Sequence, residues 1–319
     1  MNPLDAILRE AIRRDGPLRF DHFMQTALYH PELGYYRRRR DPFGIHGDFV
    51  TAAQMQPEFG DLIGYLIQHR MPGRPPSAIR VVDLGAGRGE MAPALARFAY
   101  RAVEVGDALP PADIVFANEF FDALPVRAGV MLGTKPHELL VAAGDGGFAW
   151  VNGPVLDAEA SQYLVRYWLP REPGQRFEIA EQSRGWVARI ADAIEDGWLI
   201  AIDYGHTRAE TVRFPDGSLI SYQRHAAFDD VLQSPGERDI TAHVSFDALR
   251  QDAVDAGFDN IELRTLGAVL LDCVEQSDYL RGASPASRQR IKTLLFGMGE
   301  TFRVLLARKK KAPTNRGHR

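Results

Sequence analysis

The stretch that decides the fold is Val81-Val82-Asp83-Leu84-Gly85-Ala86-Gly87-Arg88-Gly89-Glu90. It begins as a buried strand and breaks, directly after a carboxylate, into a loop with glycine at alternate positions. Glycine lets a backbone approach a ligand closely and adopt dihedral angles that a side chain would forbid. A helix predicted over residues 90–98 would turn its free N–H groups back towards that ligand. The stretch therefore predicts a nucleoside-binding turn between a strand and a helix.

Two classes of nucleoside cofactor compete for this turn. A nicotinamide dinucleotide favours the spacing G-x-G-x-x-G and a helix N-terminus that faces its pyrophosphate. Here the glycines are Gly85, Gly87 and Gly89, and Asp83 would repel a phosphate. S-adenosylmethionine (SAM) has no phosphate and carries two positive groups, a sulfonium and an ammonium. A carboxylate beside the loop therefore favours SAM.

A second acid supports the same choice. Glu104 lies 21 residues after Asp83, at the end of the next predicted strand, residues 101–105. From that position a carboxylate can accept hydrogen bonds from both ribose hydroxyls. An acid at this position also binds the ribose of NAD. Glu104 therefore distinguishes SAM from NAD only together with Asp83 and the glycines. A tight strand-to-helix turn that binds nothing stays open as an alternative.

The acceptor of a methyl group is predicted to bind at Asn118-Glu119-Phe120-Phe121-Asp122, which follows another apolar run at residues 113–117. Because this motif also ends a core strand, we expect it at the same edge of the sheet as the glycine loop. Methyl transfer is an in-line displacement, in which positioning supplies much of the acceleration. Glu119 and Asp122 suit a guanidinium acceptor, whose pKa lies above about 12. Alternatively, Asp122 caps the next turn and the two phenylalanines belong to the core.

A later strand, predicted over residues 198–202, ends in Asp203-Tyr204-Gly205-His206. Asp203 and His206 are candidates for the same rim. A histidine there is either a base or a structural hydrogen-bonding group, and the sequence leaves both open.

Strands that alternate with helices predict an α/β fold with a mostly parallel sheet covered on both faces. We expect N-terminal helices and an active-site loop over residues 1–75 and a cofactor-binding core over 76–307. Insertions at about 126–175 and 207–242 interrupt this core, and we expect irregular segments to cap its ligand edge. Residues 308–319 are basic and have nothing apolar to bury, which predicts a disordered tail.

Composition bounds the class of protein. The 319 residues are 45% hydrophobic and 25% charged, as in an ordinary soluble globular protein. A formal net charge of −4 argues against a general nucleic-acid binder. No apolar stretch reaches the roughly 18 residues of a membrane helix, and the acids among the arginines of residues 1–17 are unlike a transit peptide. We expect a cytoplasmic protein that neither binds nucleic acid nor inserts into a membrane.

Motifs spread over nearly the whole chain point to one family. They are His30-Pro31-Glu32-Leu33-Gly34-Tyr35-Tyr36, Gly47-Asp48-Phe49-Val50-Thr51-Ala52, the glycine loop, Asn118-Glu119-Phe120-Phe121-Asp122-Ala123-Leu124-Pro125, Asp203-Tyr204-Gly205-His206 and Asp239-Ile240-Thr241-Ala242-His243-Val244, with shorter matches at 23–24, 59–60 and 298–300. In these motifs the sequence resembles the MidA family of SAM-dependent methyltransferases. The mitochondrial members of that family are complex I assembly factors that methylate an arginine.

The resemblance implies a class I, Rossmann-like methyltransferase fold with SAM as the cofactor and no metal. It implies a protein nitrogen as the acceptor, most simply an arginine of a respiratory complex I subunit. It also places Asp48 and Thr51 in the cofactor and substrate site. It does not indicate an oligomeric state.

The link between Glu104 and Asn118 departs from the family. Only 13 residues separate the two, too few for the helix and strand that usually intervene in this fold. The missing stretch normally contacts the adenine ring, so either Asp107 takes over that contact or SAM binding is weakened. The short link keeps a second function open, an assembly chaperone that retains the fold with weak or no catalysis. An NAD-dependent oxidoreductase is a third, disfavoured by Asp83 and by the glycine spacing.

Overall fold

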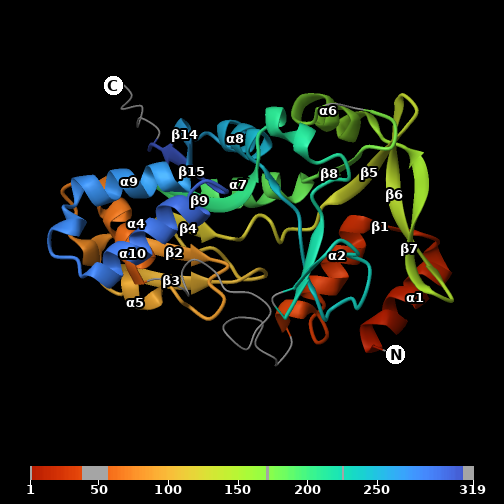
Figure 1. Cartoon of the computed structure of the whole chain (residues 1–319), viewed down its shortest axis with the longest axis horizontal. Coiled ribbons are helices and arrows are strands. Elements are labelled where there is room, and N and C mark those ends of the chain that lie inside the picture. Colours follow the sequence, from red (N-terminus) through yellow and green to blue (C-terminus); the bar gives the residue numbers. More distant parts are fainter. Residues whose placement is uncertain (1, 38–56, 170–171, 225, 312–319) are drawn as a thin grey trace, which may run out of the picture. The chain divides into compact units, whose positions relative to one another are not determined.

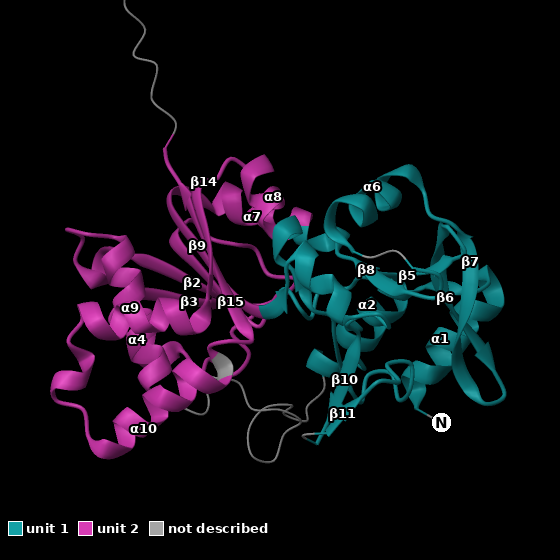
Figure 2. Cartoon of the chain, turned by 45° about the horizontal axis from the view of Figure 1, so that its top comes forward, with its two compact units in different colours: residues 1–51, 121–183, 204–248 teal, residues 52–120, 184–203, 249–319 magenta. Residues whose placement is uncertain are grey.

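The chain forms two compact units, each assembled from segments far apart in the sequence (Figure 2). The computed structural model describes residues 2–37, 57–169, 172–224 and 226–311. Unit 1 comprises residues 1–51, 121–183 and 204–248, and unit 2 comprises residues 52–120, 184–203 and 249–319. Both predicted insertions, at about 126–175 and 207–242, therefore belong to unit 1.

Unit 2 is built around a mostly parallel sheet with the strand order β14-β15-β9-β4-β2-β3. β2 pairs in parallel with both β3 and β4, β4 pairs in parallel with β9, and β14 is antiparallel to β15. This sheet confirms the predicted α/β class. Its strands are Arg80–Leu84 (β2), Ala99–Val103 (β3), Ala112–Asn118 (β4), Ile194–His206 (β9), Asp259–Thr265 (β14) and Phe302–Lys309 (β15).

The alternation of side chains along the strands explains the core of unit 2. Residues two apart in a strand share a face, so Ile114 and Phe116 of β4 join Trp198 and Ile200 of β9 in one apolar cluster. Helices α4 and α9 add side chains to that cluster, and α7 and α8 lie on the other side of the sheet (Figure 1). The sheet is covered on both faces, as predicted. The helices are Pro57–Arg70 (α4), Ala92–Leu95 (α5), Glu181–Ala193 (α7), Phe246–Asp255 (α8), Leu266–Gln276 (α9) and Pro285–Thr293 (α10), the last continued by a π-helical turn, Leu294–Met298 (η5).

The segment around β3 is short, as the spacing of Glu104 and Asn118 predicted. Residues 104–111 contain no helix or strand, and β3 is the last strand at its edge of the sheet among the residues described. The helix predicted over residues 90–98 was wrong in length. Only Ala92–Leu95 is α-helical, because the turns of the glycine loop continue through Met91 and turns resume at Ala96. The glycine loop therefore lacks a long helix whose N-terminus could face a ligand.

Unit 1 contains two antiparallel sheets, one in the order β1-β6-β5-β8 with β7 paired to β6, and one in the order β11-β10-β12. The second lies within residues 207–242, so the expectation of an irregular insertion there was wrong. Its strands have only three or four residues, too few to show an alternating pattern. The strands are Leu18–Arg19 (β1), Arg127–Leu132 (β5), Lys135–Gly144 (β6), Gly147–Val155 (β7), Arg176–Ile179 (β8), Ile220–Gln223 (β10), Ala226–Phe228 (β11) and Asp239–Thr241 (β12). Val244–Ser245 (β13) belongs to neither sheet and pairs in parallel with the end of β9. The helices are Pro3–Asp15 (α1), Phe20–Tyr29 (α2), Tyr35–Arg37 (η1), Ala158–Tyr167 (α6) and Arg208–Arg213 (η3).

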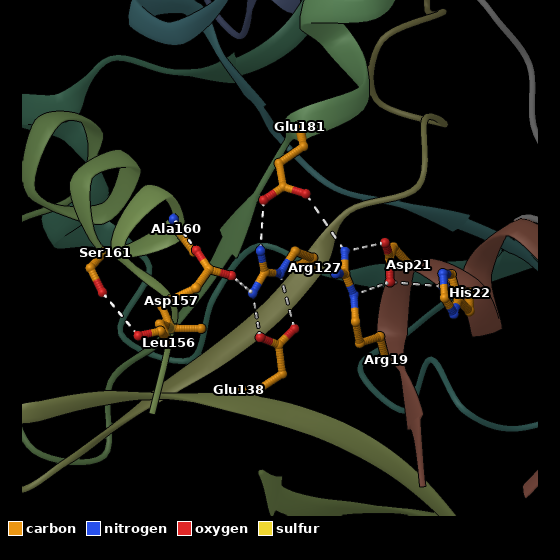
Figure 3. A network of polar contacts seen from close by, with 10 residues as sticks. All are labelled: Arg19, Asp21, His22, Arg127, Glu138, Leu156, Asp157, Ala160, Ser161 and Glu181. Atoms are coloured by element: carbon orange, nitrogen blue, oxygen red, sulfur yellow. Dashed lines mark hydrogen bonds and ion pairs between the residues drawn. The ribbon is translucent and has the colours of Figure 1, made fainter. Parts of the chain in front are cut away.

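An ion-pair network around the buried pair Arg127 and Glu138 joins β5, β6 and the starts of α6 and α7 (Figure 3). Arg127 donates from Nε and Nη2 to the two carboxylate oxygens of Glu138, at 3.1 and 2.7 Å. Its Nη1 reaches Glu181 at 2.7 Å and its Nη2 reaches Asp157 at 3.0 Å. Glu181 also contacts Arg19 at 3.6 Å. Two-point pairing of a guanidinium with a carboxylate is among the stronger polar contacts, so this network anchors the chain just after the residue 118–125 motif.

The last strand extends beyond residue 307, the predicted end of the core. β15 continues through Arg308 and Lys309, into the segment expected to be a disordered tail. Arg308 donates to the carbonyl oxygen of Gly197 at 2.9 Å and to Asp196 at 2.5 Å. Partners on β9 thus hold Arg308, and the Lys309 ammonium donates to the carbonyl oxygen of Ala191 on α7.

Candidate active site

The glycine loop follows β2, as the sequence predicted. The φ angles of Gly85, Gly87 and Gly89 are 72°, 57° and 76°, in the left-handed region that glycine enters at little cost. A Cβ atom on Gly85 would also lie 2.7 Å from Cδ2 of Phe120. The backbone conformation therefore requires glycine at all three alternate positions.

Asp83 is buried at the end of β2, with 3% of its surface exposed. The Tyr100 hydroxyl on β3 donates to its Oδ2 at 2.7 Å. Burial raises the pKa of Asp83 to about 6; the bond from Tyr100 acts against this rise, and the nearby carboxylates of Glu104 and Glu90 add to it. A cation beside the loop would relieve that cost.

Sequence reasoning missed Tyr100, although a signal existed. Asp83 pairs with Ala102 in the parallel register of β2 and β3. Residues two apart in a strand share a face, so Tyr100 is a diagonal neighbour of Asp83. The register itself was not predictable from either strand alone.

Glu104 follows β3 and turns back over the glycine loop. Its Oε1 accepts a hydrogen bond from the backbone N–H of Gly87 at 2.8 Å. Its own N–H donates to Oδ2 of Asp107 at 3.0 Å, and the N–H of Asp107 donates back to the Glu104 carbonyl at 3.0 Å. Asp107 therefore closes the turn after β3, and its contact with an adenine ring stays a prediction.

These residues fit SAM. Three carboxylates, those of Asp83, Glu90 and Glu104, interact around a loop that glycine keeps open. The sulfonium and ammonium groups of SAM would supply the positive charge that a buried Asp83 lacks. Asp48 and Thr51, also predicted here, lie outside the described residues.

Asn118 and Glu119 stand where β4 ends. Glu119 has a φ of 52°, which is uncommon for a residue other than glycine. Its N–H donates to the carbonyl of Ile202 on β9 at 2.9 Å, and Nδ2 of Asn118 donates to its carboxylate at 3.1 Å. Such conformations cost about 1–3 kcal/mol and cluster at functional sites. The strand end thus fixes Glu119 despite the strain.

Asp122 belongs to unit 1 and is 4% exposed. Its Oδ2 accepts a hydrogen bond from the Tyr204 hydroxyl, and its carbonyl accepts one from the N–H of Ala242 at 2.9 Å. Burial raises its pKa, and the bond from Tyr204 opposes that rise. Phe120 and Phe121 are both buried, in line with the alternative that assigned them to the core.

His206 is 1% exposed, and its ring lies edge-on to that of Trp168, with centroids 5.0 Å apart. Burial, with a smaller effect from His243, lowers its pKa to about 4. The imidazole is therefore neutral near pH 7 and a weak base. Its proposed catalytic role stays a prediction.

Comparison with known protein families decides the class. A family model of S-adenosyl-L-methionine-dependent methyltransferases matches residues 93–263. The chain belongs to this family. The matched range of this methyltransferase contains Glu104, the residue 118–125 motif and His206, whereas the Asp83 glycine loop precedes it.

Relatives and a solved structure agree. The methyltransferase is 29% identical over 314 residues to the protein arginine methyltransferase NDUFAF7 homologue, mitochondrial, of Drosophila melanogaster, across 78% of this chain and 70% of the relative. It is 27% identical over 351 residues to mitochondrial NDUFAF7 of Danio rerio, across 89% and 77%. A crystal structure from Burkholderia thailandensis, bound to S-adenosylhomocysteine, is 26% identical with a TM-score of 0.85, across 96% of this chain and 92% of that one. The MidA resemblance, the fold class and SAM as cofactor are confirmed.

The cytoplasmic location expected from the sequence was wrong. The relatives from Drosophila melanogaster, Xenopus tropicalis and Homo sapiens are named as mitochondrial proteins. The expectation rested on the mixed charge of residues 1–17, a local property that does not determine the compartment. Separately, none of the helices described is both long and apolar enough to cross a membrane.

Proposed function

We propose that this methyltransferase transfers a methyl group from SAM to a guanidinium nitrogen of an arginine in a protein, and that this protein is a subunit of respiratory complex I. The names of the NDUFAF7 relatives support arginine as the acceptor. The MidA resemblance supports a complex I subunit. Asp83, the three loop glycines and Glu104 are the proposed cofactor site.

The observation that carries the proposal is Asp122, a carboxylate that the fold buries at a raised pKa beside Tyr204. Charging a buried carboxylate is costly unless donors or a positive charge compensate. A guanidinium brings a permanent positive charge and five N–H donors in one plane. An acceptor arginine is the side chain that suits Asp122 best.

The roles of the residues follow from this pairing. SAM supplies an electrophilic methyl carbon with a sulfur leaving group. Asp122 pairs with the guanidinium and orients the nitrogen that accepts the methyl group. Glu119, at the end of β4, stays a second candidate for this pairing. As the N–C bond forms and the sulfur takes the electron pair of the broken bond, one N–H proton must leave. The Asp122 carboxylate, ionised while it pairs with the guanidinium, takes up that proton.

Radiolabelled methyl transfer tests the proposal. Purified complex I subunits are incubated with the protein and labelled SAM, and mass spectrometry locates the methyl group. We expect label on an arginine of one subunit and none with Asp122→Asn, whose SAM affinity, measured by calorimetry, should equal that of the wild type. Label on lysine would contradict arginine as the acceptor. Label on no subunit would contradict complex I as its source.

A further inference from the structure

A second buried carboxylate, Glu178 on β8, organises part of unit 1. It is 5% exposed, and Ser218 donates to it from its backbone N–H at 3.0 Å and from its hydroxyl at 2.8 Å. A Cβ atom on Gly217 would lie 2.3 Å from Oε1 of Glu178, so glycine is needed for this close approach. Burial raises the pKa of Glu178 to about 7 even though Ser218 donates to it. The fold thus keeps a carboxylate where a neutral side chain would cost less.

Ser218 connects this carboxylate to the backbone of His243. The Ser218 hydroxyl oxygen also accepts the backbone N–H of His243 at 3.0 Å. The Glu178 side chain therefore fixes the position of His243 through one intervening residue. None of the three residues was predicted as a site residue from the sequence.

The backbone of Glu178 is connected to a second histidine through the side chain of Trp168. Its carbonyl accepts the indole N–H of Trp168 at 2.9 Å, and the Trp168 ring lies edge-on to His206. Phe214 contacts both imidazoles, with ring centroids 5.7 Å from His206 and 4.8 Å from His243. The two histidines therefore belong to one aromatic cluster.

His243 faces the acceptor side of the site. Its ring lies edge-on to Tyr204, with centroids 5.4 Å apart, and Tyr204 donates to Asp122. Burial lowers the pKa of His243, so its imidazole is neutral near pH 7.

Several buried polar side-chain atoms in this part of unit 1 have no hydrogen-bond partner among the described residues. They are Nδ1 of His243, Nδ1 of His206, Oγ1 of Thr241 and Oγ of Ser245. Buried polar atoms are nearly always satisfied in folded proteins. Each of these atoms can accept a hydrogen bond, so the group suits a ligand rich in N–H donors.

We propose that His243 is a further acceptor-binding residue, whose Nδ1 accepts a hydrogen bond from the substrate guanidinium, and that Glu178 is the positioning residue that holds it through Ser218. The inference rests on the proposed function and deepens it. A guanidinium is planar, stacks on aromatic rings and spreads its N–H donors over one plane. The rings of Tyr204 and Phe214 and the acceptor atoms around them match that shape better than they match a compact ammonium.

Imidazole NMR tests the contact without an acceptor protein. Protein labelled with ¹⁵N-histidine and saturated with S-adenosylhomocysteine is titrated with ethylguanidinium and, in parallel, with ethylammonium. His243→Asn assigns the resonance. We expect a saturable shift of Nδ1 of His243 with ethylguanidinium only. An unmoved resonance, or the same shift with both cations, would overturn the proposal. Because no subunit is involved, this result is independent of whether complex I supplies the acceptor.

Kinetics test the role in the reaction, with the labelled subunit as the varied substrate. His243→Phe keeps the ring and removes the acceptor atom. It should raise KM for the subunit about tenfold or more, the range expected for a lost hydrogen bond to a charged group, and should leave the Kd for SAM within about twofold. His243→Asn, whose side-chain oxygen can replace Nδ1, should restore part of the loss. An unchanged KM in His243→Phe would overturn the contact.

Paired variants test the positioning residue. An amide oxygen in the place of Oε2 can accept both bonds from Ser218, whose N–H and hydroxyl lie 3.1 and 2.8 Å from Oε2, so Glu178→Gln should keep nearly wild-type KM. Glu178→Ala should behave like His243→Phe. Ser218→Ala removes the hydroxyl link with a smaller change, and serves if Glu178→Ala does not fold. A wild-type KM in both Glu178→Ala and Ser218→Ala would show that His243 does not depend on Glu178. If Glu178→Ala does not fold, a wild-type KM in Ser218→Ala shows the same.

Discussion

Replacing Asp83 by asparagine should weaken SAM binding and stabilise the ligand-free protein. The pKa of Asp83 is about 6, against an ordinary value of 3.8. One pKa unit corresponds to about 1.4 kcal/mol, so a shift of about two units means that ionising Asp83 costs the folded protein about 3 kcal/mol. Because the side chain is 3% exposed, water screens little of this cost.

The sign of the pH dependence follows from the raised pKa. The folded protein holds this proton more tightly than the unfolded chain does. The contribution to stability is therefore fully present below about pH 3.8 and lost as the pH rises through about 6. Asparagine carries no charge, and its oxygen can still accept from Tyr100. The free energy of unfolding of Asp83→Asn should exceed that of the wild type by up to about 3 kcal/mol at pH 8 and by almost nothing at pH 4.

A cationic cofactor should reverse the preference of Asp83 for its protonated form. If the positive groups of SAM return the pKa of Asp83 to its ordinary value, about 3 kcal/mol appears as binding free energy, or about 100-fold in Kd. Asp83→Asn should lose most of that factor at pH 7. The wild-type Kd should rise by up to about tenfold for each pH unit below 6.

Calorimetric titration with SAM between about pH 5 and pH 8, together with urea unfolding of the ligand-free protein, measures both effects. Asp145→Asn is the matched control, because Asp145 is an exposed acid in the turn between β6 and β7 and should leave the Kd for SAM and its pH dependence unchanged. The reasoning is refuted if Asp83→Asn binds SAM as tightly as the wild type at pH 7. It is equally refuted if the variant is the less stable protein at pH 8.

Two further substitutions test the loop and the ion-pair network. Gly85→Ala places a Cβ atom 2.7 Å from the Phe120 ring at a φ of 72°. It should cost at least about 1–2 kcal/mol of stability and raise the Kd for SAM by more than about tenfold, whereas Gly144→Ala, with nothing within 4 Å, should change neither. Arg127→Met leaves the buried carboxylate of Glu138 uncompensated and should lower the free energy of unfolding by about 3–5 kcal/mol. A loss below about 1 kcal/mol in urea unfolding would mean that the network contributes little.

The parts of the fold that could be predicted are those that local chemistry specifies. The apolar runs before Gly85 and Asn118 indicate buried strands by themselves, and the 13-residue gap between Glu104 and Asn118 limits what can lie between them. The strands of residues 220–241 could not be found in this way. Each is stable only through its pairing with the others, and such short segments carry no period of their own.

The same distinction applies to the site. Asp83 and Glu104 stand out because they lie at the ends of consecutive predicted strands, at a spacing that nucleoside chemistry explains. Tyr204 was quoted only as part of a motif, and its bond to Asp122 spans 82 residues. Glu178 and Ser218 are 40 residues apart, and neither has a neighbour in the sequence that suggests its role. Residues that act through tertiary contacts become visible only when the fold brings their partners together.

Three buried acids, Asp83, Asp122 and Glu178, share a raised pKa caused first by burial. Elsewhere the protein compensates the charge of a buried carboxylate with one of its own arginines, because Arg127 donates two hydrogen bonds to Glu138. An acid kept at a raised pKa instead is one whose charge a cationic ligand can stabilise, and both SAM and an arginine side chain are cations. Acidification from pH 7 to pH 5 should therefore favour folding of the ligand-free protein through Asp83 and Asp122 while it weakens binding of both cations. A carboxylate that stabilises the fold through an internal ion pair would instead weaken both folding and binding on acidification.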